Sequence, residues 1–285
     1  MTAPPGRRPD EAVWTRVDSV GGAPLDLLAA RFGRRHYAPH THEEYAVGVC
    51  TDGLEVIRYR GGLHRSGPDS LVVVEPGEAH TGGPAVPDGF AYRVLYPTAA
   101  LLTESAGDAG RPPHFRGPVL HDAPLAAALR SVHLLLSRGH DPLEAETRLL
   151  TLLGALTARH AAPAPARRSP APAAARVARL VRARLADEMP RPPALAEIAA
   201  DLGLSRYQVL RAFREAAGMP PYAWLAQHRV TRARALLETG HRPAEVAGLV
   251  GFADQAHLTR WFRRVLGVTP GAYRNSVQDA ARARR

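Results

Sequence analysis

The sequence predicts a multidomain α+β protein with a β-rich N-terminal part and an all-α C-terminal part. Short apolar runs between turn residues occupy residues 24–96, and helical apolar patterns occupy the chain beyond residue 176. A proline- and alanine-rich segment, Ala161–Ala175, lies between the two parts. Because 285 residues exceed the size of most single cores, more than one domain is expected.

The N-terminal part has the pattern of a small β-barrel or sandwich. Residues 1–20 contain no apolar signal core, and we expect them to be disordered. Residues 21–120 carry short apolar runs separated by turn signals such as Thr51-Asp52-Gly53 and Pro87-Asp88-Gly89. These runs predict five strands: Leu25–Arg31, Glu44–Val49, Leu54–Tyr59, Leu71–Val74 and Ala91–Tyr96.

A helical hairpin is expected over residues 121–160. Pro124–Leu136 and Pro142–His160 each carry a stripe of leucines at helical spacing, and a tight turn at Arg138–Asp141 joins them. The stripes can cover the barrel or pair with a second copy of the chain. Residues 161–175 should form an exposed, semi-extended linker.

The pattern of residues 176–275 predicts helices only, and one arrangement of two helices occurs twice. A short helix opened by a proline ends at Gly203 or Gly251, and a second helix follows, capped by Ser205 or Asp254. This order is a helix-turn-helix. A continuous helix, Tyr222–Glu238, separates the two copies and should be ~25 Å long. Residues 276–285 form a basic tail.

Charge is divided unequally between the two parts. All 37 basic residues are arginine. Residues 1–160 hold 16 Arg and 18 Asp or Glu, a net charge of −2, whereas residues 161–285 hold 21 Arg and 9 Asp or Glu, a net charge of +12. This asymmetry indicates a polyanionic partner for the C-terminal part. With one cysteine and no apolar run long enough for a bilayer, a cytoplasmic protein with no membrane partner is expected.

The second helix of each repeat has a polar face suited to double-stranded DNA. Arginine can donate two hydrogen bonds to guanine and glutamine can pair with adenine, while tyrosine and threonine can contact a thymine methyl group. A solvated helix face is the alternative interpretation. The candidate DNA-binding residues are Ser205, Arg206, Tyr207, Gln208, Arg211, Gln255, His257, Thr259, Arg260 and Arg263.

The C-terminal part resembles a known family. The stretch from Gly251 to Arg264, followed by Gly267-Val268-Thr269-Pro270, closely resembles the C-terminal signature of AraC/XylS-type transcriptional regulators. The resemblance covers about residues 174–275 and implies two helix-turn-helix units on adjacent major grooves. By matching positions, the residues implied to face bases are Tyr207, Arg211, Gln255, His257 and Arg260.

Two short histidine motifs mark the N-terminal part. His40-Thr41-His42 and Pro76-Gly77-Glu78-Ala79-His80 resemble the half-motifs of cupin barrels, which AraC-type regulators often carry as effector domains. Three histidines can bind a transition metal, as a catalytic or a sensory ion. Because no glutamate at the usual spacing completes the set, we expect no metal and no cofactor. His40, His42 and His80 then line an organic-effector pocket, with Tyr45 as a further candidate, or close turns.

The favoured hypothesis is an AraC-type, sequence-specific transcriptional regulator without enzymatic activity. A small-molecule effector would bind the cupin-like barrel, the hairpin would form a homodimer, and RNA polymerase is a candidate protein partner. The alternatives are a cupin-type metal enzyme with a basic helical appendage and an architectural DNA-binding protein that needs no ligand. The missing glutamate and the C-terminal signature count against the enzyme.

Overall fold

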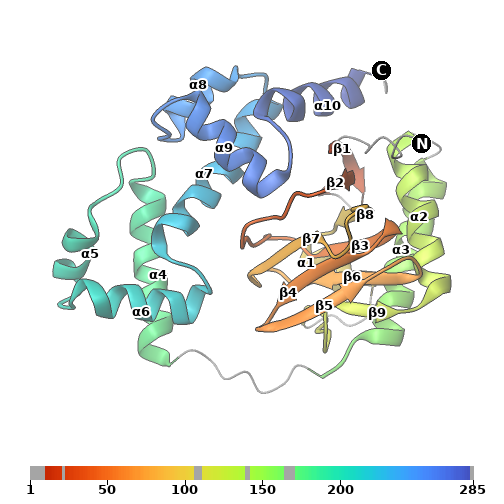
Figure 1. Cartoon of the computed structure of the whole chain (residues 1–285), viewed down its shortest axis with the longest axis horizontal. Helices are drawn as coiled ribbons and strands as arrows, with labels where there is room; N and C mark the ends of the chain where they lie inside the picture. The colour runs from red at the N-terminus through yellow and green to blue at the C-terminus, as the bar shows by residue number, and fades with distance from the viewer. Residues whose placement is uncertain (1–9, 21–22, 106–110, 139–141, 164–170, 283–285) are drawn as a thin grey trace, which may run out of the picture. The chain divides into compact units, whose positions relative to one another are not determined.

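A computed structural model describes residues 10–20, 23–105, 111–138, 142–163 and 171–282. The chain divides into two compact units, with the main boundary between residues 164 and 165. The N-terminal unit combines β-strands with a few helices, and the C-terminal unit is helical (Figure 1). The multidomain α+β class predicted from the sequence is confirmed.

The N-terminal unit contains two antiparallel sheets, one with strand order β1-β2-β8-β3-β6-β9 and one with order β5-β4-β7. Helices α1, α2 and α3 belong to the same unit. The strands are β1 (Glu11–Val20), β2 (Ala23–Phe32), β3 (Ala46–Gly53), β4 (Glu55–Tyr59), β5 (Gly62–Ser66), β6 (Ser70–Val74), β7 (His80–Pro84), β8 (Phe90–Tyr96) and β9 (Val119–His121). The helices are α1 (Ala99–Ser105), α2 (Ala123–Arg138) and α3 (Pro142–His160).

The larger sheet is buried on both faces, which explains why β3 reads as a continuous apolar run. On one face, alternate residues such as Leu27, Val49 and Leu95 pack with the leucine stripes of α2 and α3 in one core. On the other face, aromatic rings of β2 and β8 contact the segment between β2 and β3, since Phe32 contacts Tyr37 and Tyr96 contacts His42. This segment in turn pairs with β7 of the smaller sheet through His40 and His80. Functional side chains can therefore be held between the two sheets.

The structure corrects the expected limits of several segments. Residues 11–20 form β1 and are not disordered, and the buried Trp14 stacks on Tyr96 at 5.2 Å between ring centroids. Strands β5, β7 and β9 and helix α1 are absent from the five-strand prediction. α4 begins at Pro172, inside the expected linker. Residues 1–9, the centre of the hairpin turn at 139–141 and the linker residues 164–170 lie outside the described residues.

The leucine stripes of the hairpin face the sheet of their own chain. Leu129, Leu136, Leu149 and Leu156 are fully or almost fully buried there. Of the two arrangements left open by the sequence, covering the sheet is thus the one that uses these leucines. If the hairpin contacts a second chain, the inward leucines are not available for that contact.

The C-terminal unit contains two helix-turn-helix pairs, α5–α6 and α8–α9, separated by α7. Its helices are α4 (Pro172–Asp187), α5 (Leu195–Asp201), α6 (Arg206–Ala217), α7 (Pro221–Glu238), α8 (Pro243–Leu249), α9 (Gln255–Leu266) and the first part of α10 (Pro270–Arg282), since the unit ends at Asn275. Local sequence sets several ends, because Pro221 and Pro243 begin helices and the left-handed Gly218 and Gly267 end them. α10 includes part of the expected basic tail.

Within the described part of the chain, no helix is both long and apolar enough to span a bilayer.

Candidate functional site

α6 presents the first set of predicted DNA-contacting side chains. Val209 and Phe213 are buried in the core of the unit, so the opposite face of the helix is directed to solvent. Tyr207 leaves 71% of its surface exposed, which is unusual for so large a ring. The five predicted residues on this segment are exposed: Ser205, Arg206, Tyr207, Gln208 and Arg211.

Two of these residues cap the helix. The backbone N–H of Gln208 donates to Ser205 Oγ at 3.2 Å, and the backbone N–H of Ser205 donates to Gln208 Oε1 at 2.8 Å. This reciprocal capping box fixes the start of α6. Arg206, Tyr207 and Arg211 are the predicted readers that the capping box does not involve.

α9 presents the second set of predicted DNA-contacting side chains. Gln255, Arg260 and Arg263 are exposed, whereas His257 and Thr259 are half-buried. The His257 ring makes an edge-to-face contact with the Phe252 ring, with 5.1 Å between the ring centroids. The backbone N–H of His257 donates to the Asp254 carboxylate at 2.6 Å, which caps the helix. The exposed face of α9 therefore centres on its glutamine and arginines.

Arg229 on α7 makes two long-range contacts that no local sequence motif indicates. Its Nε and Nη2 both donate to the Met189 carbonyl, at 3.1 and 2.7 Å, between α4 and α5. The same guanidinium lies 5.6 Å from the centre of the Phe252 ring, next to the turn of the second repeat. Arg229 therefore links the segment before the first helix-turn-helix pair to the turn of the second pair.

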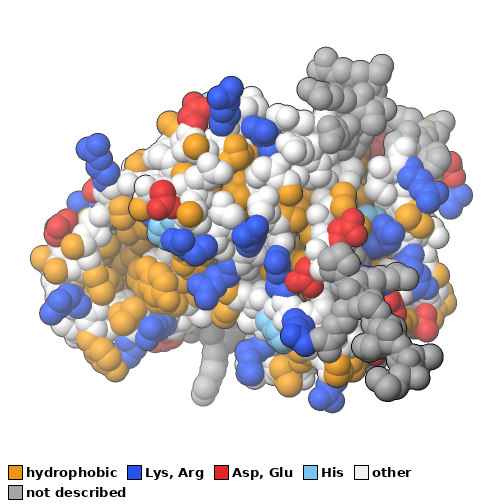
Figure 2. Space-filling model, turned by 45° about the horizontal axis from the view of Figure 1, so that its top comes forward, with side chains coloured by type: hydrophobic (Ala, Val, Ile, Leu, Met, Phe, Trp, Pro, Cys, Tyr) orange, Lys and Arg blue, Asp and Glu red, His pale blue; other side chains and the backbone are white. Residues whose placement is uncertain are grey.

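The described residues form no single continuous basic patch on the face of the molecule shown in Figure 2. Figure 2 shows one face of the molecule on which arginines are scattered among acidic and apolar side chains.

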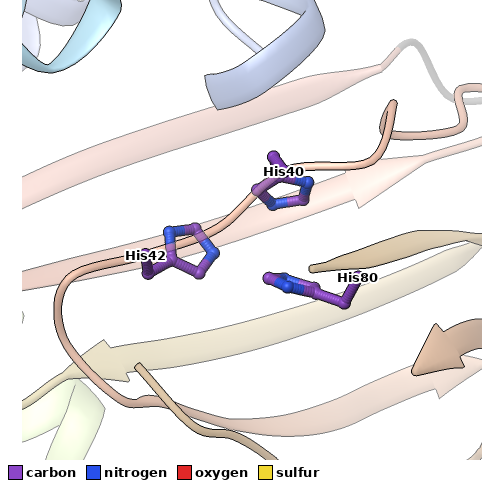
Figure 3. A group of neighbouring side chains, drawn as sticks. All are labelled: His40, His42 and His80. Carbon is purple, nitrogen blue, oxygen red and sulfur yellow. The ribbon is translucent and has the colours of Figure 1, made fainter. Parts of the chain in front are cut away.

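His40, His42 and His80 meet in the N-terminal unit, as Figure 3 shows. His40 and His42 precede β3, and His80 begins β7. Ring centroids are 4.2 Å apart for His40 and His80, 4.9 Å for His40 and His42, and 5.0 Å for His42 and His80. One nitrogen from each ring lies within 4.8 Å of the other two. Residues 38 positions apart are thus brought into a single cluster, which we call the histidine cluster.

The backbone holds two members of the histidine cluster firmly. His40 and His80 exchange reciprocal backbone hydrogen bonds, both 3.0 Å long. Their Nδ1 atoms lie 2.8 Å from the Ala38 carbonyl and 3.1 Å from the Glu78 carbonyl. Because a carbonyl only accepts, Nδ1 carries the proton in each ring and the lone pair is on Nε2.

Burial keeps two imidazoles of the cluster, those of His40 and His80, neutral. It lowers the pKa of His40 to about 4. Burial, with a smaller contribution from His40, lowers the pKa of His80 to about 3. His40 and His80 therefore offer uncharged nitrogen donors at neutral pH. Among the described residues, no carboxylate joins this group of possible ligands.

Two other residues from the barrel lie elsewhere. Tyr45, predicted to line an effector pocket, is buried in the core that includes α2 and α3, and its hydroxyl donates to the Pro113 carbonyl at 2.6 Å. Glu55 is buried on β4, where burial raises its carboxyl pKa to about 8. The lack of a side chain at Gly82 makes room for it, since a Cβ there would lie 2.8 Å from Glu55 Oε1.

A hollow of about 310 Å³ opens on β1, β2 and β8 and is lined in part by Arg31 and Arg93. Arg93 Nη1 donates to His133 Nδ1 at 3.2 Å, so His133 Nε2 carries the proton and donates to the Leu28 carbonyl at 3.1 Å. Burial, and then the charge of Arg93, lower the pKa of His133 to about 4. His133 is therefore neutral in the folded protein.

This arrangement predicts that acid destabilises the N-terminal unit. The unfolded chain binds a proton at His133 near pH 6.5 but the folded chain only near pH 4, so stability falls as pH drops through this window. Between pH 7 and pH 5 this residue should account for a loss of ~2 kcal/mol. Urea unfolding at both pH values measures it, with Trp14 fluorescence as the probe in a Trp224→Phe/Trp261→Phe background.

His133→Gln is the matched variant, because an amide can donate to Leu28 and accept from Arg93 but cannot be protonated in this range. Between pH 7 and pH 5 the unfolding free energy of this variant should fall by ~2 kcal/mol less than that of the unchanged protein. Equal pH dependence in both proteins would contradict the assignment.

Two family models match the chain, one for each unit. The AraC-like ligand binding domain matches residues 22–153, and a helix-turn-helix domain matches residues 198–276. The uncharacterised HTH-type transcriptional regulator YbfI of Bacillus subtilis is 26% identical over 239 residues, which are 82% of this chain and 86% of that protein. The arabinose operon regulatory protein of Escherichia coli is 29% identical over 86 residues, 30% of each chain.

Solved structures of ToxT from Vibrio cholerae share the fold. An apo form has a TM-score of 0.57 and 13% identity, covering 89% of this chain and 97% of that one. A form with bound unsaturated fatty acid has a TM-score of 0.52 and 13% identity, covering 95% and 98%.

A unit that matches a ligand-binding domain model, followed by a unit with two helix-turn-helix pairs, is the organisation of a DNA-binding protein with a separate ligand-binding domain. Both units match the corresponding family models in the expected order. The chain belongs to the AraC-type transcriptional regulators.

Proposed function

We propose that this regulator recognises promoter DNA through α6 and α9 and that a small molecule bound in its N-terminal unit controls this recognition. It acts in the cytoplasm as a homodimer, without catalytic activity, and RNA polymerase is its protein partner at the promoter. The exposed polar faces of α6 and α9 within one compact basic unit are the observation that supports this proposal best. The match to the AraC-like ligand binding domain supports a ligand in the N-terminal unit.

The N-terminal unit would influence the DNA-binding unit through the ligand's preference for one arrangement of the full chain. The dimer would use the outward face of the hairpin, where Leu143 is 74% exposed at the start of α3. Sedimentation of the full chain at micromolar concentration tests this contact, and a monomer at all concentrations contradicts it.

A genome-wide map of the DNA bound by the full chain tests the main proposal. The expected result is sharp occupancy at one or a few promoters, with a shared motif of two segments about 10 base pairs apart. Diffuse occupancy without a motif would favour an architectural protein and overturn the proposal.

Arg260→Ala should weaken binding to the mapped operator by ~1–3 kcal/mol and relax base preference at one position. The reason is that Arg260 is exposed on α9 and can make two hydrogen bonds to one base. Titration of labelled operator and single-base variants at fixed salt measures both effects. Arg232→Ala, which removes the same charge from an exposed position on α7, is the control. If both variants lose the same affinity for every sequence, Arg260 contacts phosphate and does not read a base.

A further inference from the structure

The histidine cluster has the features of a metal site. We propose that His40, His42 and His80 bind one divalent transition metal ion, with zinc(II) as the ion that the donors suit best. This inference names the ligand class for the N-terminal site, and only its effect on DNA binding rests on the proposed function.

The spacing of the donors supports the site. One nitrogen from each ring lies within 4.8 Å of the other two, and two segments of the chain contribute. Nitrogens around a single tetrahedral zinc ion lie ~3.3 Å apart, given zinc–nitrogen distances of about 2.0–2.1 Å. Small rotations of the rings shown in Figure 3 can therefore bring all three donors onto one ion.

The orientation of the rings supports it independently. In His40 and His80, Nδ1–H donates to a backbone carbonyl, which leaves Nε2 as the donor atom. Metal-binding histidines almost always have such a hydrogen bond from their other nitrogen, because it fixes the ring and raises the basicity of the donor. The reciprocal backbone hydrogen bonds between His40 and His80 keep these two rings close before any ion arrives.

The chemistry of the set indicates the class of ion. Neutral imidazoles suit zinc, copper and nickel, whereas magnesium, calcium and manganese prefer oxygen ligands. Three histidines alone can hold zinc and leave a fourth position for water or another ligand. The expectation of no metal was based on a missing glutamate, and a three-histidine set does not require one.

A simple structural role is the alternative for these rings. Buried histidines can close turns through backbone hydrogen bonds, and His40 and His80 do make such bonds. That role accounts for Nδ1 of each ring. It does not account for the approach of a third imidazole, His42, to both of them.

The test uses the full chain stripped of metal with a chelator. Cobalt(II) is added as a probe, because its visible absorption reports on coordination, and zinc(II) is then added in competition. We expect one cobalt ion per chain, the absorption of a four-coordinate site, and displacement by one equivalent of zinc. Absence of this absorption, or of saturable binding at one ion per chain, would overturn the proposal.

His42→Gln is the variant of choice, because His42 is only half-buried and makes no part of the His40–His80 backbone pair. Changing an outer partner of a metal ligand costs about 10–100-fold in affinity, so loss of a ligand should weaken cobalt binding at least ~10-fold. His36→Gln changes an exposed histidine of the same unit and should bind cobalt as the unchanged protein does. Equal urea midpoints of the metal-free proteins show that the folds are comparable. Equal loss in both variants, or in neither, would refute the assignment.

The link to regulation has its own measurement. Operator affinity of the full chain with and without zinc should differ in the unchanged protein and stay constant in His42→Gln. A bound ion that leaves operator affinity unchanged would overturn the regulatory link. Failure of the metal-free and the zinc-bound chain to bind any DNA would count against the proposed function and not against the metal site.

Discussion

Gly251→Ala is expected to destabilise the C-terminal unit by ~3 kcal/mol, because two penalties combine at this turn. Gly251 has φ of +83°, a left-handed conformation that is unfavourable for a residue with a side chain. A Cβ here would also lie 2.6 Å from Pro190 Cα and 2.7 Å from the Pro190 carbonyl oxygen. Since both are backbone atoms, they cannot move aside without displacing the connection between α4 and α5.

The other repeat provides a matched control. Gly203 occupies the corresponding turn with φ of +63°, but a Cβ there would meet nothing within 4 Å. Gly203→Ala should therefore cost only the conformational penalty of ~1–2 kcal/mol. Urea unfolding of the full chain in a Trp14→Phe background measures both variants through Trp224 and Trp261. Equal losses would show that the contact with Pro190 has no energetic importance.

Arg229→Ala should cost ~2–4 kcal/mol, because it removes two charge-assisted hydrogen bonds and a contact with an aromatic face. The Met189 carbonyl would lose both donors, and Phe252 would lose its cation. Arg229→Lys should restore only part of the stability, since an ammonium group lacks the planar fork of arginine. The same fluorescence assay measures both variants.

Arg232→Ala serves as the control for Arg229, because Arg232 lies on the same helix and is exposed. Its effect on stability should stay within ~0.5 kcal/mol. Affinity for the two-segment operator should fall in Arg229→Ala more than affinity for one segment alone. If Arg229→Ala left the free energy of unfolding unchanged, the two hydrogen bonds to Met189 would not stabilise the C-terminal unit.

Local chemistry made the DNA-binding half predictable from the sequence. Ser205 and Asp254 cap helices through contacts only three residues away, and glycines end helices through their own backbone conformation. Such features are visible in any short window of sequence. The histidine motifs were visible in the same way, although only the fold shows that the two motifs meet.

Contacts between distant segments explain what the sequence analysis missed. β1 depends on pairing with β2 and on the burial of Trp14 against Tyr96, and its first residues lie in a segment that looks like a polar terminus. The glycine-rich β7 has few strand-forming residues and is set by its pairing with β4. Arg229 and Met189 are 40 residues apart, so no periodicity links them. Tyr45 shares the barrel sequence with the histidines but faces the helical core.

The junction at Arg229 has a consequence for the DNA that this regulator can use. α7 packs against α6 of the first repeat and against α8 and α9 of the second, so it holds α6 and α9 at one separation and one relative rotation. Each base pair inserted between the two operator segments moves one segment ~3.4 Å along the duplex and turns it by ~35°. Because a fixed internal spacing cannot follow that rotation, we expect single insertions or deletions between the two operator segments to weaken binding even where every contacted base is kept.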